Sequence, residues 1–311
     1  MNKLRRFFYQ NKYQILGVLG IIILIIVIIQ LMNFWARKSN TEDVIKNNTK
    51  IINGSNNENN KGLISDKSAV TGNEISQTQL ENATTTISSF FEYCNNQKLD
   101  KAYELLTDEC KKQMYNSLDV FKQSYYKNVF NGEKMNYTIE NWVKDTYRVN
   151  ITGDLLATGK DDGYSKLDYI TVKRSDDEYK LNINNYIGYT EINKKTTEDN
   201  ISINVISKNT YKDYEEYTIS ATNNTENIVQ LDNISNTDTL YLEDSKGVKY
   251  PYYNHELTVP MVTIPSGQTK EVAIKFYSSY VSTKKIERIV FSSVILKNGQ
   301  LSETTKIYAN I

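Results

Sequence analysis

The sequence DYITVKRSDDEYKLNINNY, residues 168–186, contains the clearest secondary-structure pattern in this chain of 311 residues. Two runs within it alternate apolar and polar side chains, most regularly at Tyr179, Leu181 and Ile183. Ser175-Asp176-Asp177 joins the two runs and has the composition of a tight turn. The stretch therefore predicts a β-hairpin.

Helices are expected before this hairpin. A capping-box spacing begins at Ser76, and apolar residues then follow at helical spacing as far as Cys94. Further short helices are expected after it, one of them capped by Thr107. The apolar period changes from helical to alternating over residues 137–151. Helices followed by an antiparallel sheet predict an α+β domain at residues 77–190.

Two parts of this domain resemble nuclear transport factor two-like domains. SSFFEYCNNQKLDKAYELLTDE, residues 88–109, is similar to the opening helices of that family, and residues 168–186 are similar to its closing hairpin. The resemblance implies helices on a curved antiparallel sheet with a cone-shaped pocket. It leaves two roles open, because some members are isomerases or dehydratases and many are inert binding or assembly modules.

An enzyme of this fold would need an acid, a tyrosine or a histidine inside the cone. The domain has no histidine. The available acids and tyrosines are Asp145, Asp154, Asp168, Tyr137, Tyr147 and Tyr169. Exposed strand carboxylates and core tyrosines are the ordinary explanation of such residues, so we expect no catalytic residue and no enzyme.

Residues 197–311 contain no convincing helical pattern. Short alternating runs, roughly seven in number, are separated by turn sequences such as Asp244-Ser245-Lys246-Gly247 and Pro265-Ser266-Gly267. Asn298-Gly299, between two alternating runs, is a strong hairpin signal. This pattern is typical of an all-β sandwich.

Three stretches of this second domain resemble immunoglobulin-like domains of bacterial envelope proteins. They are YTISATNNTENIVQL (217–231), LYLEDSKGVKYP (240–251) and IPSGQTKEVAIKFYS (264–278). The Cys-Trp-Cys core of antibody domains is absent from the sequence. The resemblance implies adhesion or assembly rather than catalysis.

The longest apolar run of the chain is ILGVLGIIILIIVIIQLMNFW, residues 15–35. Eighteen helical residues would span about 27 Å, close to a hydrocarbon core of about 30 Å. A cleaved signal peptide would have a shorter apolar run that ends in small residues. We therefore expect an uncleaved transmembrane helix. Its anchoring residues would be Ile15, Leu16, Ile21, Ile22, Leu24, Val27, Leu31, Phe34 and Trp35.

Charges on the two sides of this run predict its orientation. The basic residues of the preceding tail, residues 1–14, are Lys3, Arg5, Arg6 and Lys12. Acids soon follow the basic pair Arg37-Lys38 on the other side. The positive-inside rule then places the N-terminus in the cytoplasm and residues 36–311 outside. Residues 36–76 have no aromatic side chain and are rich in Asn, Ser and Lys, which predicts a disordered tether.

The composition of the whole chain excludes some classes of function. Lys and Arg number 37 and Asp and Glu number 37, so no net positive charge points to nucleic acid. Asn, Ile, Lys and Tyr are abundant, as expected for a bacterium with an AT-rich genome. Cys94 and Cys110 are too few for a disulfide framework, and buried thiols are expected, with a single disulfide left open.

No motif indicates a metal or a cofactor. His255 begins the sequence HELTV, in which Val259 replaces the second histidine of a zinc-binding HExxH helix. Asp161-Asp162-Gly163 and Asp176-Asp177 lack the ligand spacing of a calcium loop and are interpreted as turns. We therefore expect no metal site and no cofactor.

The expected fold class is one N-terminal transmembrane helix, then an α+β domain, then an all-β immunoglobulin-like sandwich. The expected function is that of a single-pass membrane-anchored, extracytoplasmic binding or scaffold protein of a bacterial cell envelope, without catalysis. Its expected partners are the lipid bilayer, through residues 15–35, and envelope proteins or cell-wall material. Self-association is left open.

Two alternatives remain at this point. The α+β domain could be a sensor that holds a small apolar ligand in its cone, or it could be an isomerase-like or dehydratase-like enzyme. A cone filled by Phe, Tyr and Leu side chains would argue against the sensor. A polar, partly open cone with a perturbed carboxylate would favour the enzyme.

Overall fold

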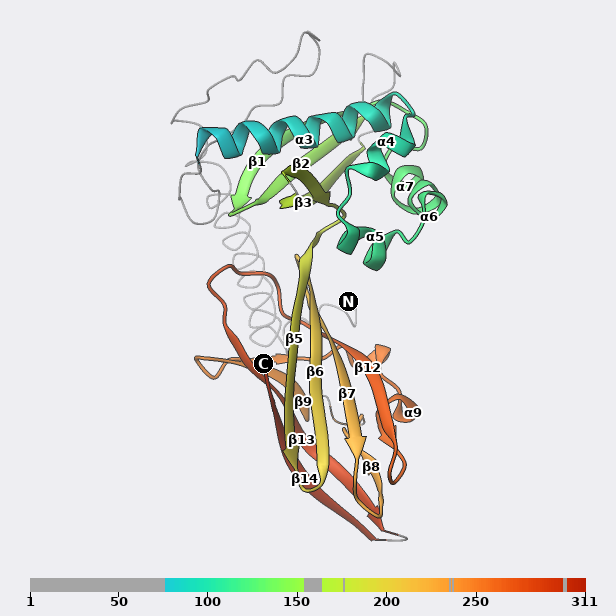
Figure 1. Cartoon of the computed structure of the whole chain (residues 1–311), viewed down its shortest axis with the longest axis vertical. Coiled ribbons are helices and arrows are strands. Elements are labelled where there is room, and N and C mark those ends of the chain that lie inside the picture. The colour runs from blue at the N-terminus through green and yellow to red at the C-terminus, as the bar shows by residue number, and fades with distance from the viewer. Residues whose placement is uncertain (1–75, 154–163, 176, 235, 237, 299–300) are drawn as a thin grey trace, which may run out of the picture. The chain divides into compact units, whose positions relative to one another are not determined.

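A computed structural model describes residues 76–153, 164–175, 177–234, 236, 238–298 and 301–311 (Figure 1). All of these residues belong to one compact unit of the chain, residues 50–311. They form two lobes, each with its own hydrophobic core. We call residues 76–185 the first lobe and residues 186–311 the second lobe.

The first lobe begins with helices whose caps were predicted from the sequence. Ser76 accepts a hydrogen bond from the backbone N–H of Gln79 at 3.2 Å, and Thr107 accepts one from the N–H of Cys110 at 3.0 Å. The helical elements are α3 (Gln77–Asn95), α4 (Leu99–Glu104), α5 (Asp108–Met114), α6 (Leu118–Phe121), the π-helical turn η1 (Lys122–Tyr126) and α7 (Lys127–Val129).

The sheet of the first lobe is antiparallel and has the order β1-β2-β3-β4. Its strands are β1 (Met135–Val143), β2 (Thr146–Gly153), β3 (Ser165–Ser175) and β4 (Glu178–Asn182). The hairpin expected at residues 168–186 is confirmed, with Ser175 opposite Glu178 and Thr171 opposite Asn182. α3 crosses this sheet and contacts β1, β3 and β4 (Figure 1).

Aromatic side chains fill the space between α3, the shorter helices and the sheet. Phe90 and Phe91 of α3 are completely buried, and the Phe91 ring stacks on Tyr137 of β1 at 4.4 Å between centroids. Phe121 and Tyr125, one turn apart, stack on each other at 5.9 Å. Fully burying each such side chain contributes about 1.5–3 kcal/mol, so this cluster stabilises the lobe more than any single polar contact.

The second lobe consists of two sheets around one shared core. Its strands are β5 (Tyr186–Glu198), β6 (Ile201–Tyr211), β7 (Glu215–Asn223), β8 (Ile228–Gln230), β9 (Leu240–Asp244), β10 (Lys249–Pro251), β11 (Thr263–Ile264), β12 (Thr269–Phe276), β13 (Ile286–Asn298) and β14 (Leu301–Asn310). Two short helical turns, η2 (Asn254–Glu256) and α9 (Val259–Val262), are the helical elements among the described residues here. The sequence pattern did not predict them.

One sheet of this lobe has the order β12-β7-β6-β5. In the other sheet, β13 pairs with β14 on one edge and with β9 and β8 on the other. Asn298 lies opposite Leu301, as the hairpin signal at Asn298-Gly299 predicted. Alternate residues of both sheets, such as Ile203, Ile219 and Ile289, are completely buried in the common core.

β5 belongs to both lobes. Tyr186, at its start, is buried in the core of the first lobe, whereas residues 194–198 pair with β6 in the second lobe. The polar segment Glu191–Asn200 is therefore strand and turn. Asp199 and Asn200 have φ angles of 49° and 59°, the left-handed values that a two-residue hairpin requires.

A series of backbone and side-chain contacts, which begins at Asp168, connects the two lobes. The carboxylate of Asp168 accepts the N–H of Asn185 at 2.9 Å, and the Asn185 carbonyl accepts the N–H of Lys212 at 2.8 Å. The Lys212 carbonyl in turn accepts the N–H of Tyr280 at 2.8 Å. The Tyr280 ring lies 5.9 Å from Trp142 of β1, so the chain of contacts returns to the first lobe.

A series of tyrosine rings forms a second connection. Centroid distances are 5.2 Å for Tyr186–Tyr211, 4.2 Å for Tyr211–Tyr214, 5.9 Å for Tyr214–Tyr253 and 3.7 Å for Tyr253–Tyr277. The series begins in the core of the first lobe and ends at Tyr277, which is 48% exposed. Offset and edge-to-face pairs of this kind stabilise beyond their buried area, by about 0.5–1.5 kcal/mol each.

A buried polar cluster holds the loop that carries Tyr280. The Glu215 carboxylate, at the start of β7, accepts the hydroxyl groups of Ser278 at 3.0 Å and Tyr217 at 3.3 Å. Two ammonium groups lie beside the carboxylate, Lys208 Nζ at 3.4 Å and Lys284 Nζ at 4.0 Å. Burial lowers the pKa of Lys284, and the nearby Glu215 carboxylate opposes that shift.

The predicted fold class, which began with a transmembrane helix, is wrong for the structure that is described. Strands take up 50% of the described residues and helices 23%, so the structure is mainly β. None of the helices described here combines the length and hydropathy that a membrane crossing requires. Residues 15–35, the tether and the tail with Lys3, Arg5, Arg6 and Lys12 lie outside the described residues, so the predictions made for them stay predictions.

The first prediction concerns Asp168, whose burial raises its pKa above the ordinary value of 3.8 despite three hydrogen-bond donors. Between the unfolded and the folded pKa, the folded state binds more protons, so this group's contribution to stability falls as pH rises. Asp168→Asn should lower the free energy of unfolding by about 1–3 kcal/mol at pH 4 and by less at pH 8. Urea unfolding at both pH values measures the difference. A difference that grows with pH would show that the folded pKa of Asp168 is lowered instead.

The second prediction concerns the buried cluster around Glu215. Glu215→Gln leaves Lys208 and Lys284 without their counter-charge and should lower the free energy of unfolding by about 3–5 kcal/mol. Glu271→Gln, on an exposed residue of β12, is the matched control and should change it by less than about 0.5 kcal/mol. Equal effects of the two substitutions in urea unfolding would show that the cluster contributes nothing specific.

Candidate binding surface

The structure separates most of the candidate catalytic residues. Asp168 is not an exposed strand acid: it is completely buried and accepts the Tyr125 hydroxyl at 2.9 Å and the backbone N–H of Asn184 at 3.1 Å. Tyr137 stacks on a core phenylalanine, and Tyr169 packs against Trp142 at 4.5 Å between centroids. Asp154 lies outside the described residues. Asp168 therefore holds structure together rather than facing a substrate.

Asp145 and Tyr147 are the two candidates that do come together. They line a surface hollow of about 470 Å³, with Ala83 and Val172 on its apolar side and Lys173, Arg174 and Tyr179 among its polar neighbours. The Tyr147 hydroxyl is buried and has no hydrogen-bond partner within the part of the chain that the structure describes. Burial is the main cause that raises its pKa. Ser76, the N-cap residue of α3, also bounds this first hollow.

The interior of the first lobe is filled. Phe90, Phe91, Phe121 and Phe130 have no exposed surface, and Tyr125 is 2% exposed. They occupy the space between helices and sheet where a cone-shaped pocket was expected. A sensor would need an empty cone, and this one is filled by aromatic side chains, so the packing argues against a small apolar ligand inside the lobe.

The second lobe contains one pair of groups with catalytic chemistry. The Lys284 amine donates to the Ser278 hydroxyl at 2.5 Å, and a lysine beside a serine activates the nucleophile in some hydrolases. Ser278 has no exposed surface, and its hydroxyl donates to Glu215. A nucleophile must reach its substrate, so this pair has a structural role.

The remaining candidate groups have ordinary environments. His255 is exposed on the turn η2, with its ring 5.9 Å from Tyr253. Across the described residues, no cluster of His, Cys, Asp and Glu could hold a metal ion. Cys94 and Cys110 are free and buried, and burial raises the pKa of Cys110 to about 12. Their thiols are core side chains.

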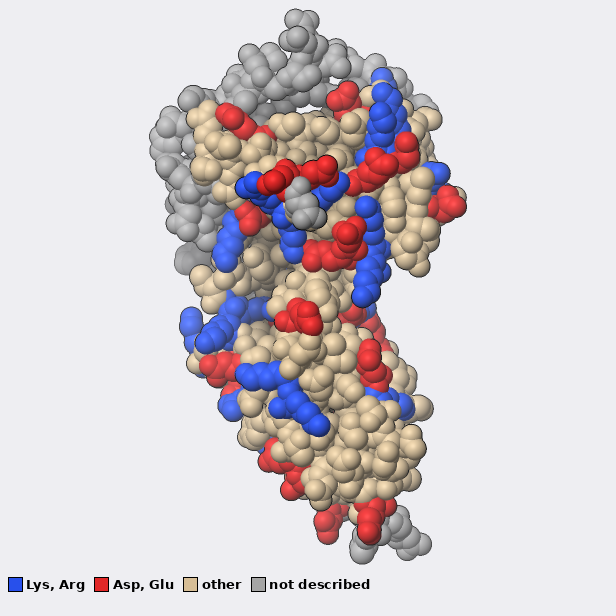
Figure 2. Space-filling view, in the orientation of Figure 1, with Lys and Arg blue, Asp and Glu red and all other residues tan. Residues whose placement is uncertain are grey.

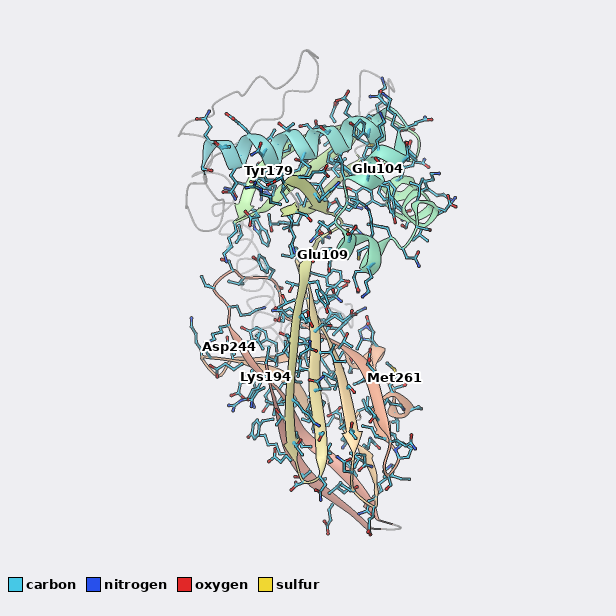
Figure 3. All side chains as sticks on the ribbon, viewed as in Figure 1. Glu104, Glu109, Tyr179, Lys194, Asp244 and Met261 are labelled. Atoms are coloured by element: carbon cyan, nitrogen blue, oxygen red, sulfur yellow. The ribbon has the colours of Figure 1, made fainter. Side chains whose placement is uncertain are left out.

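A second hollow lies beside the outer edge of β4 and has a volume of about 590 Å³. α3 and α4 form one wall and β4 forms the other. Tyr179 borders this hollow and the first one, and Figure 3 labels it together with Glu104. The lining residues are Asn82, Thr85, Thr86, Tyr93, Lys101, Glu104, Leu105, Glu178, Tyr179 and Lys180.

The backbone of β4 is open toward this hollow at Tyr179. Further along the strand, the N–H and C=O of Leu181 bond to Leu105 at 2.8 Å and to Thr107 at 3.0 Å, so both groups point away from β3. Orientation alternates along an antiparallel strand, so the N–H and C=O of Tyr179, two residues earlier, point the same way. Among the described residues, β4 pairs only with β3 and, at Leu181, with Leu106. We call Glu178–Lys180 and the second hollow the β4 edge surface.

The charges around the β4 edge surface nearly balance. Lys180 Nζ lies 2.8 Å from the Glu178 carboxylate, and Lys101 lies over the Tyr93 ring at 5.9 Å. Figure 2 shows basic and acidic side chains interspersed over the visible face of this lobe. The hydroxyl of Tyr179 accepts a hydrogen bond from Asn82 of α3 at 3.0 Å, which fixes the ring. The surface therefore favours a ligand with little net charge and with backbone groups to share.

Comparison with known proteins gives no relative. No protein-family model, no curated protein and no solved structure matches the chain. The resemblances to nuclear transport factor two-like and immunoglobulin-like domains therefore stay predictions.

The third prediction follows from the orientation of the β4 backbone. The amide of Tyr179 faces outward and should exchange with solvent on the order of a thousandfold faster than the amide of Leu181, which is bonded to Leu105. Hydrogen exchange of the full-length protein in detergent, read at single residues, measures the ratio. Equal protection of both amides would mean that the edge at Tyr179 is already covered.

Proposed function

We propose that this protein is a non-catalytic binding and scaffold protein that holds a partner protein at the β4 edge surface. One observation carries this proposal: an open strand edge lies beside a hollow of about 590 Å³, while the interior of the same lobe is filled by aromatic side chains. Exposed strand edges are the places where a sheet can take on another chain. Asp168, Ser278, Cys94 and Cys110 are buried away from any substrate, which supports binding rather than catalysis.

The connection between the lobes supports the scaffold part of the proposal. β5, the contacts from Asp168 to Trp142 and the tyrosine series make three separate links between the two cores. A partner held at the first lobe is then held in a defined orientation to the second lobe. Defined orientation is what an assembly needs from a scaffold.

The place of action is part of the same proposal. The apolar run of residues 15–35 and the basic residues before it support attachment to a bacterial membrane, with the β4 edge surface on the extracytoplasmic side. The balanced charge of the chain supports protein or cell-wall partners over nucleic acid.

The fourth prediction tests this function by photo-cross-linking in cells. A benzophenone amino acid at Thr85, an exposed residue of α3 in the second hollow, should capture a partner protein reproducibly. The same amino acid at Thr197, an exposed threonine of β5 in the second lobe, is the matched control and should capture at least about tenfold less. Mass spectrometry identifies what is captured.

Two outcomes would contradict the proposal. Equal capture at Thr85 and Thr197 would mean that the β4 edge surface has no special affinity. Capture of nothing at Thr85, in cells that express the protein at its natural level, would mean that this surface is not a binding site.

A further inference from the structure

We infer that the β4 edge surface binds an extended segment of another protein, which pairs with Tyr179 as an added strand of the β1–β4 sheet. This inference rests on the proposed function and names its class of partner. It begins from the backbone of Tyr179, whose N–H and C=O point away from β3 into the second hollow. A strand that pairs at this position would exchange both hydrogen bonds with one residue of the partner.

The length of open edge limits how the partner binds. Toward its C-terminal end, β4 is covered at Leu181 by the bridge to Leu106. Toward its N-terminal end, β4 begins at Glu178, directly after the hairpin turn. Three residues at about 3.3 Å each leave roughly 10 Å of edge, enough for one hydrogen-bonded pair. At one end of this stretch the Lys180 ammonium donates to the Glu104 carbonyl at 3.1 Å and so bridges from β4 to α4. Backbone pairing alone is therefore weak, and side chains in the hollow must add to it.

The side-chain preference follows from the same geometry. Residues paired across two strands have their side chains on the same face of the sheet. The Tyr179 ring is on the α3 face, because its hydroxyl accepts from Asn82. The partner residue opposite Tyr179 would thus direct its side chain into the hollow, whose lining includes Tyr93 and Leu105. An apolar or aromatic side chain without charge fits this position.

An extended segment fits this edge better than a second copy of this chain. In a symmetric pair of β4 edges, both copies would bring a Tyr179 ring to the same place, where each ring is already bonded to its own Asn82. Each copy would also bring its own Leu105–Thr107 segment, which lies directly beside β4. A flexible segment has neither obstacle.

The fifth prediction separates the backbone of Tyr179 from its ring. Tyr179→Ala removes the ring and keeps the N–H, whereas Tyr179→Pro removes both. Proline is tolerated on an edge strand where the N–H faces away from the sheet, as it does here. With the benzophenone at Thr85 in full-length protein, Tyr179→Pro should reduce capture about tenfold below Tyr179→Ala, which corresponds to one hydrogen bond of roughly 1.4 kcal/mol.

The outcomes distinguish this inference from the proposed function. Equal capture by Tyr179→Pro and Tyr179→Ala, with both variants as stable as each other in urea, would overturn strand addition and leave a binding surface. If the proline destabilises the fold, the comparison is replaced by hydrogen exchange at the Tyr179 amide of the unsubstituted protein, measured with the captured partner added. An amide that stays unprotected would overturn the inference. Capture of a second copy of this chain would also overturn it, and capture of nothing would overturn the proposed function as well.

Discussion

The rest of the structure depends on the carboxylate of Asp168, which accepts the backbone N–H groups of Asn184 and Asn185 from inside the first core. These two residues have φ angles of 59° and 65°, a turn that asparagine tolerates better than most residues. The turn ends the hairpin and directs Tyr186 and β5 toward the second lobe. Without an acceptor for its two N–H groups, the turn would have buried polar groups unpaired, and the start of β5 would lose its position.

The same turn determines which strand edge stays open. Asn182, just before it, is held by Glu109 at 2.7 Å and by Thr107, so α5 and its cap lie against the end of β4. This contact covers β4 at Leu181 and stops there. The exposed portion around Tyr179 therefore begins where the Leu105–Thr107 segment leaves the edge of β4, and the second hollow is the space between β4 and the helices α3 and α4.

Local pattern predicted many of the elements of this protein, but it predicted neither η2 and α9 nor the surface. Ser76, Thr107 and the alternation at Tyr179, Leu181 and Ile183 determine structure within a few residues of themselves, and those predictions are confirmed. Asp168 was expected on an exposed strand, because its buried partner Tyr125 comes from a helical turn that the local sequence does not bring near. Nothing local shows that Leu105 covers part of β4, so the open edge could not be predicted. The end of the first domain was expected at residue 190, inside β5, because most of this edge strand is exposed and polar.

The two lobes depend on each other because they share β5. A chain cut after residue 190, where the sequence pattern alone would end a domain, would leave Tyr186 without Tyr211 and Asn209, its ring and hydroxyl partners. The second lobe would lose the edge strand that pairs with β6. Neither half could then be exchanged, duplicated or deleted in evolution without repairing the other. A change in β5 therefore has to suit both cores at once.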